Sequence, residues 1–155
     1  MSTAPIARHE SLKPFSRDHH HGLLLCWKIR EGSKRQVEPE RISKYVSWFW
    51  QQHLKQHFDL EEQYIFPILQ PDDALRVQAQ EEHKRLRNYF SDEQEIKTFL
   101  PDIERELDAH IRFEERILFR HIQEKASPGQ LQELAQHHTD KFQDDWEDEF
   151  WTRSE

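Results

Sequence analysis

The chain has 155 residues, the size of one domain, and such a domain buries about two-thirds of its unfolded surface. Charged residues make up 34% and hydrophobic residues 35%, so the eighteen aromatic side chains must supply much of a thin core. The net charge of −8 has the wrong sign for a nucleic-acid interface, and three Gly are too few for a β-sandwich or a Rossmann phosphate loop. A single cysteine, Cys26, excludes a disulfide framework and a Cys-based zinc site. No apolar run approaches the roughly 18 residues that span a bilayer, and residues 1–15 lack the apolar stretch of a secretory signal. We therefore expect a helix-rich cytoplasmic protein with neither nucleic acid nor a membrane as its partner.

The first half of the chain predicts an arm and two helices. Residues 1–15 contain two prolines and no sustained period, which is typical of an arm. A helix is expected to begin after an N-cap at Ser16 and to end at Gly32 and Ser33. A second should open with Pro39 in its first turn and continue to about Phe66.

The second half predicts three more helices. Asp72 is a suitable N-cap for a third helix that ends near Phe90. A fourth should extend from residues 91–92 to about Lys125, with a kink or restart at Pro101. The segment 127–130, Ser-Pro-Gly-Gln, reads as a capping box that opens a fifth helix directed toward Trp151.

Long helices joined by short connections favour an all-α fold, an up-down-up-down four-helix bundle with a short extra C-terminal helix. We assign residues 1–15 to an N-terminal arm, 16–126 to the bundle and 127–155 to the extra helix and an acidic tail. The aromatic residues of that tail, Trp146, Phe150 and Trp151, are expected to dock on the bundle.

An internal repeat links the second and fourth predicted helices. The segments 54–69 and 107–122 are identical at five positions, including a His, two consecutive Glu and a Phe. Each copy contains His-x-x-x-Glu, as His57 with Glu61 and as His110 with Glu114. Residues four apart on an α-helix lie about 6 Å apart along the axis and about 40° apart around it, so each imidazole and carboxylate share a face.

Apolar residues occupy that same face in both copies. In the first copy Leu54 and Ile65 flank the pair, and in the second copy Leu107 and Ile117 do so. Burying a histidine and a glutamate in a bundle without a partner is costly, and a shared cation would remove that cost. Because the pattern occurs twice, we interpret the two pairs as metal ligands.

The first and third helices should contribute ligands at the same depth. His83 is the candidate in the third helix. In the first helix we select His20, since Leu23, Leu24 and Trp27 follow at helical spacing, and His19 remains the alternative.

Together these residues form a donor set of four imidazoles and two carboxylates without sulfur. The predicted metal ligands are His20 (or His19), His57, Glu61, His83, His110 and Glu114. Mixed nitrogen and oxygen donors suit iron, manganese or zinc, and carboxylates from two helices can bridge a pair of ions. A ferritin-like site needs Glu-x-x-His, and no histidine here has a glutamate three positions before it.

These residues resemble the hemerythrin-like HHE cation-binding domain family. The resemblance covers roughly residues 16–124 and rests on DHHHGLL, HFDLEEQYIFPIL, EEH and HIRFEERILFRHI. It implies a four-helix bundle with a non-haem centre, usually two irons bridged by carboxylates, that binds dioxygen or serves in iron handling or stress responses.

The sequence departs from the oxygen-carrying members of that family in the third helix. Those members have a second histidine one turn from the first, whereas Ala79 and Arg87 stand four residues from His83 here. This leaves room for water, for a carboxylate such as Glu82 or for an exogenous ligand. A simple oxygen carrier is therefore less favoured than a sensor or a reactive site.

The sequence leaves several functions open. We expect a non-haem di-iron protein that binds or senses dioxygen or another small diatomic ligand, and a non-enzymatic role is favoured. The alternatives are iron handling or a redox activity in oxidative or nitrosative stress, a zinc-bound site, and a purely structural bundle. Of the other histidines, His53 and His121 are expected to be structural or solvated, His21 is expected to be solvated, and His137 and His138 are expected at the surface. Glu62 and Glu115 are either exposed or support the ligands.

Overall fold

The computed structural model describes residues 7–138 and 142–152, and within these ranges the protein is all-α and has no strand. A 3₁₀ turn, η1 (Glu10–Leu12), leads into α1 (Lys13–Lys34). The next helical segment comprises α2 (Pro39–Phe49), a π-helical turn η2 (Trp50–Leu54), α3 (Lys55–Leu60), a second π-helical turn η3 (Glu61–Ile65) and a 3₁₀ turn η4 (Phe66–Ile68). After α4 (Ala74–Tyr89) come α5 (Glu93–Thr98), α6 (Leu100–Phe113), a π-helical turn η5 (Glu114–Leu118), α7 (Phe119–Lys125) and α8 (Pro128–His137).

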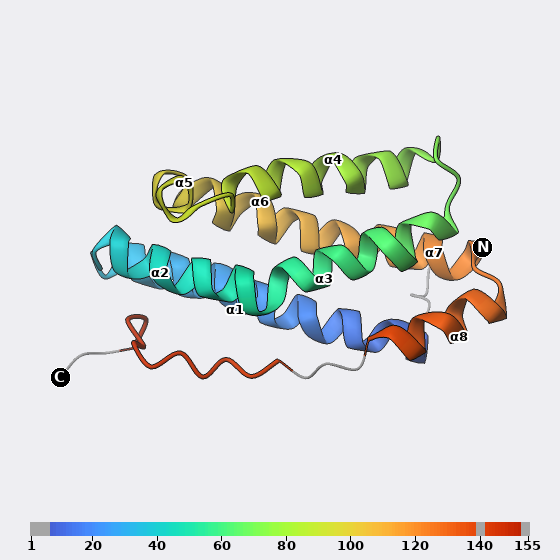
Figure 1. Ribbon diagram of the computed structural model, residues 1–155, viewed down its shortest axis with the longest axis horizontal. Coiled ribbons are helices and arrows are strands. Elements are labelled where there is room, and N and C mark those ends of the chain that lie inside the picture. Colours follow the sequence, from blue (N-terminus) through green and yellow to red (C-terminus); the bar gives the residue numbers. More distant parts are fainter. Residues whose placement is uncertain (1–6, 139–141, 153–155) are drawn as a thin grey trace.

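The long helical segments are bundled. In Figure 1, α1, the α2–α3 segment, α4 and the α6–α7 segment lie side by side and alternate in direction along the chain. Residues 142–152 then pass back beside α1 and α2 (Figure 1). No described helix is both long enough and apolar enough to cross a membrane.

The first helix begins earlier and ends later than predicted. Pro14 occupies its first turn, where the fixed φ of proline suits a helix and the missing N–H needs no partner, so Ser16 is not the N-cap. Gly32 lies inside the helix: a Cβ there would meet Ile42 Cδ1 and Phe150 Cε1 at 2.8 Å. This glycine therefore permits close packing instead of ending the helix.

The later boundaries agree with the predictions more closely. Pro39 stands in the first turn of α2, and Pro101 restarts the helix after α5. The third helix is capped by Asp73, not Asp72, because the Asp73 carboxylate accepts from the backbone N–H of Leu75 at 2.9 Å. The capping box of Ser127 with Gln130 is confirmed.

The fifth helix ends at His137 and does not extend toward Trp151. Residues 142–152 are instead irregular, and their aromatic side chains pack on the bundle as expected: Phe150 and Trp151 are buried in the core cluster near α2 and α5. Lys28 Nζ donates to Asp144 Oδ2 at 2.7 Å, and Arg41 forms a two-point ion pair with Asp148. These ion pairs and the buried aromatic side chains hold the irregular segment against the bundle.

The apolar core has two parts with a polar layer between them. One cluster gathers around α2, α5 and the first half of α6, and the other around η1, η3, η5 and α7. Along α1 the buried side chains change from Phe15 in the second cluster to His19 and then to Leu25 in the first. The buried histidines and glutamates of the bundle lie at this level.

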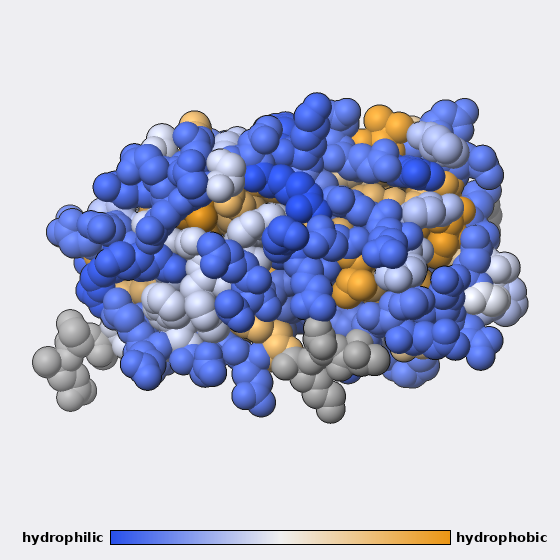
Figure 2. Space-filling view, in the orientation of Figure 1, coloured by the Kyte–Doolittle hydropathy of each residue, from blue (hydrophilic) through white to orange (hydrophobic). Residues whose placement is uncertain are grey.

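The surface is largely polar on the face drawn in Figure 2, with small hydrophobic patches among charged side chains. Among the described residues the large exposed hydrophobic side chains include Leu24, Trp27 and Ile117, at 38%, 42% and 50% exposure. The sequence pattern placed all three on the apolar faces of the predicted ligands, and the structure shows instead that they face solvent.

Candidate metal centre

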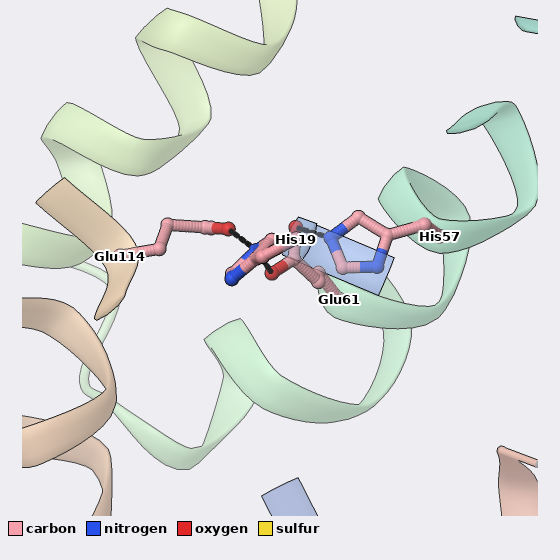
Figure 3. A group of neighbouring side chains, drawn as sticks. All are labelled: His19, His57, Glu61 and Glu114. Atoms are coloured by element: carbon pink, nitrogen blue, oxygen red, sulfur yellow. Dashed lines mark hydrogen bonds and ion pairs between the residues drawn. The ribbon is translucent and has the colours of Figure 1, made fainter. Parts of the chain in front are cut away.

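Six buried side chains converge between the two apolar clusters. They form two groups of four, each able to place its donor atoms within 4.8 Å of one another, and both groups contain Glu61 and Glu114. The first group adds His19 and His57 and the second adds His83 and His110. We call these six residues the inner cluster. Figure 3 shows its first group: His19 comes from α1, His57 and Glu61 come from the α2–α3 segment, and Glu114 comes from η5, and the side chains point toward one another.

The first-helix residue of the inner cluster is His19, and the prediction of His20 is corrected. His19 is 3% exposed, whereas the side chain of His20 faces solvent. The inward stripe of α1 consists of Phe15, His19, Gly22 and Cys26, which repeats at the helical spacing of three to four residues. Gly22 was judged a poor neighbour for a ligand, yet a Cβ there would lie 2.6 Å from Ile111 Cδ1, so the glycine lets α1 approach α6 closely.

The inner donor atoms are spaced as ligands of a common ion would be. His19 Nε2 lies 2.8 Å from Glu114 Oε1, and both His57 Nε2 and His83 Nε2 lie near Glu61 Oε1, at 3.2 and 3.1 Å. His110 Nε2 is 3.4 Å from Glu114 Oε2. Donors about 2.1 Å from one metal ion are about 3.0–3.4 Å from each other. Three of the four separations lie in that range, and the His19–Glu114 separation is shorter, at hydrogen-bond distance.

A carboxylate outside the inner cluster holds the other nitrogen of every inner histidine. The four pairs are His19 Nδ1 with Glu115 at 2.7 Å, His57 Nδ1 with Asp18 at 2.9 Å, His83 Nδ1 with Glu62 at 2.7 Å and His110 Nδ1 with Glu82 at 2.7 Å. We call Asp18, Glu62, Glu82 and Glu115 the outer carboxylates. Because an ionised carboxylate only accepts, each Nδ1 donates, and each Nε2 points inward as a potential metal ligand.

The residues of the inner cluster fit a bound cation. Burial should leave few polar atoms without partners, yet four inner atoms have no hydrogen-bond partner within the described residues: Nε2 of His57 and His110, and Oε2 of Glu61 and Glu114. All four can act as metal donors and are fully or almost fully enclosed. One metal ion in each of the two groups would satisfy all four atoms.

Charge within the cluster shifts the pKa values in opposite directions. Burial alone would lower the pKa of His57 and His110, but attraction to Glu61 and Glu114 and hydrogen bonds to carboxylates raise them to about 9 and about 10. Burial would raise the pKa of Glu61, but His57, His19 and His83 bring it well below its usual value. Protons and a metal ion therefore compete for the inner Nε2 atoms.

The helix geometry changes at the two inner glutamates. The π-helical turns η3 and η5 begin at Glu61 and Glu114, where the N–H groups of Phe66 and Phe119 bond to carbonyls five residues earlier. Single π turns inside α-helices are frequent at functional sites. The two copies of the sequence repeat therefore also share a backbone feature, a π-helical turn that begins at the inner glutamate.

Aromatic and arginine side chains enclose two of the inner histidines. The His19 ring stacks on Phe119 at 5.1 Å and the His83 ring on Phe58 at 3.9 Å. An arginine then contacts the ring and the outer carboxylate of each: Arg8 with Phe119 and Glu115, and Arg87 with Phe58 and Glu62.

The third helix contributes one inner histidine. Ala79 is buried in the second apolar cluster, and Arg87 turns outward to ion pairs with Asp59 and Glu62. Glu82, which was considered as a replacement ligand, instead holds His110 from outside the inner cluster.

For the remaining histidines and glutamates, the structure agrees with some of the predictions and contradicts others. Glu62 and Glu115 support inner histidines, one of the two roles left open for them, and His121 forms an ion pair with Asp73. His137 is partly exposed and stacks on Tyr64. His138 was expected at the surface but is 7% exposed and bonds to Asp18, a role that residue spacing could not show because it depends on how α8 docks.

No protein-family model matches the chain, and neither a curated protein nor a solved structure is similar to it.

Proposed function

We propose that this protein is a hemerythrin-like four-helix bundle that binds two metal ions, with Glu61 and Glu114 bridging them. The observation that carries the proposal is the double set of donors: each group in the inner cluster has two imidazoles and shares both carboxylates. His19 and His57 would hold one ion, and His83 and His110 the other.

We propose iron as the metal. Nitrogen and oxygen donors without sulfur suit iron, and sites with two imidazoles, a carboxylate and open coordination positions are typical of non-haem Fe(II) proteins that react with dioxygen. A bound iron pair would supply reversible redox chemistry with dioxygen or another small diatomic ligand. The protein itself holds the imidazoles through the outer carboxylates, surrounds them with Phe58 and Phe119, and limits water access by burial.

A second candidate function is turnover: oxidation of Fe(II), or reduction of peroxide or nitric oxide. The single histidine of the third helix favours it, because each ion would have only two imidazoles and retain positions for exogenous ligands. Binding and turnover would use the same metal-coordinating residues. They differ in whether the exogenous molecule is released unchanged or converted to a product.

The test is to load the protein anaerobically with Fe(II), count bound iron, and record the visible spectrum while dioxygen is admitted and removed. Two irons per chain with a reversible spectral change would support a dioxygen-binding protein. Two irons with irreversible oxidation, or steady consumption of a reductant, would support the second candidate. Binding of zinc but not Fe(II) would contradict the iron assignment, and binding of neither would contradict the metal centre itself.

A matched pair of variants makes the test specific. His19→Ala removes an inner donor, whereas His20→Ala removes the neighbouring, exposed imidazole. We expect His19→Ala to lose the iron held by His19 and His57, and His20→Ala to keep both irons.

A further inference from the structure

Among the four inner histidines, His57 has the most deeply buried outer carboxylate: the Asp18 side chain is 7% exposed, and those of the other three outer carboxylates are 28–37% exposed. His57 Nδ1 donates to Asp18 Oδ2 at 2.9 Å. Asp18 directly precedes His19, so α1 supplies both a donor of the inner cluster and the group that orients a donor on α3. Asp18 is 6% exposed, which leaves its carboxylate dependent on protein partners.

The second partner of the Asp18 carboxylate is distant in the sequence and follows α8 directly. His138, the residue after α8, places Nε2 2.5 Å from the same Asp18 oxygen. Its ring packs edge-on against Phe15, with centroids 4.8 Å apart. His138 therefore connects the C-terminal segment to the inner cluster through Asp18 and His57.

Little space remains around this connection. The cavity lined by Asp18, His53, His57 and His138, together with Gln56 and Leu60, has a volume of about 10 Å³. That volume is at the lower limit for one water molecule. Water cannot readily replace His138 unless the side chain or α8 moves.

The corresponding position in the other half of the centre has no such support. Glu82 holds His110 as Asp18 holds His57, but its side chain is 28% exposed and its other oxygen accepts from the Gln78 amide on the same helix. Asp18 and Glu82 thus orient their histidines in the same way, but Asp18 is supported by the buried His138 and Glu82 by the amide of Gln78.

We propose that His138 is a positioning residue for the metal ion held by His19 and His57. By donating to Asp18 it fixes the carboxylate that aligns His57 and its inward Nε2. Without His138, the carboxylate can turn toward His53 Nε2, which lies 3.6 Å from Asp18 Oδ1 and has no hydrogen-bond partner within the described residues. This inference rests on the proposed metal centre and adds His138, the residue after α8, to the groups that position its ligands.

The experiment compares metal binding by the full chain and its variants, with Co(II) and then Fe(II) titrated against a competing chelator. Removing support behind a metal-ligating histidine costs about 10–100-fold in affinity. His138 acts one contact further out than Asp18, so we expect His138→Ala to weaken one of the two ions by about 10-fold, the lower end of this range, and to leave the other within about twofold. The Co(II) absorption bands of the weakened ion should shift as well.

Two further variants separate positioning from general stability. His138→Gln places an amide N–H near the position of Nε2, so it should restore most of the affinity. Gln78→Ala removes the support of Glu82, which solvent can replace, so both affinities should remain near those of the wild type. Thermal unfolding of every variant shows how much each change affects the fold.

The outcomes are distinct. Two ions with unchanged affinities in His138→Ala would overturn this inference and leave the proposed function intact. An equal loss of both ions, without rescue by His138→Gln, would also overturn it, because that is the result of a merely structural residue. If His138→Ala does not fold, selective weakening of one ion in His138→Asn relative to His138→Gln supports the inference, and equal binding overturns it. A wild-type chain that binds no metal would overturn the proposed function together with this inference.

Discussion

The two halves of the inner cluster are similar at their centre and different at their periphery. Each half has a histidine from one helix and a His-x-x-x-Glu pair from the next, and each Nδ1 is held by an outer carboxylate. The supports beyond the carboxylates differ. Arg8, before η1, and His138, after α8, support the His19/His57 half, whereas Arg87 and Gln78, both on α4, support the other.

The space around the outer groups also differs between the two halves, although all four inner histidines are at most 3% exposed. A pocket of about 420 Å³, lined by Glu62, His83 and Arg87 among others, reaches the His83/His110 half from the surface. The cavity beside Asp18 and His57 has only about 10 Å³. The repeat thus places equally buried donors in both halves, while segments outside the repeat determine how enclosed the outer carboxylates are.

Removing a shared glutamate should have the largest effect, because it breaks both halves. We expect Glu61→Ala or Glu114→Ala to lose both ions, with affinities reduced by more than the roughly 100-fold expected for an outer group. Elemental analysis gives the metal content and circular dichroism the helix content. Full metal occupancy in either variant would contradict the shared carboxylates.

Removing one histidine should affect one half. His57→Ala and His110→Ala are each expected to leave one tightly bound ion, because the other group keeps all of its donors. Chelator competition measures the stoichiometry. If either variant lost both ions or neither, the division into halves would be wrong.

Neutralising an outer carboxylate should have a smaller effect, and one that differs between the halves. Asp18→Asn is expected to weaken its ion by about 10–100-fold, and more than Glu82→Gln does, since Asp18 is buried and holds two histidines. Equal effects in matched titrations would mean that the deeper burial of Asp18 has no consequence.

Without metal, stability should fall as the pH rises above 6.5, and bound metal should reverse this trend. The pKa values of His57 and His110 are raised to about 9 and about 10, so their contribution is complete below about 6.5 and is lost as the pH rises through the folded values. The lowered pKa of Glu61 contributes stability above its unfolded value of about 4.5 that is lost in acid. With a chelator present, Tm should therefore fall by a few degrees between pH 6.5 and 10.

Bound metal changes the sign of this trend at neutral and mildly alkaline pH. It replaces the Nε2 protons, so its stabilisation should grow as the pH rises from 6 to 8. Thermal unfolding with and without added metal measures both trends. A Tm that rises with pH in the presence of chelator would contradict the charge pairing of the inner cluster.

Sequence periodicity predicted the all-α fold, most helix boundaries and five inner residues, because these follow from local spacing and from the repeat. It failed at His20, since the apolar residues Leu24 and Trp27 that favoured it face solvent, while the true inward stripe uses Gly22. Asp18 and Glu82 each directly precede a histidine of the inner cluster, and that shared acid-His dipeptide was an available signal for the outer carboxylates. The burial of His138 depends on tertiary docking and has no comparable signal.

The central claim is that Glu61 and Glu114 are shared between two metal ions. A crystal structure of the iron-loaded protein, with anomalous diffraction recorded on both sides of the iron absorption edge, tests it most directly. We predict two iron peaks in contact with both carboxylates, one beside His19 and His57 and the other beside His83 and His110. One peak alone, or iron bound at the exposed His20, would contradict this account.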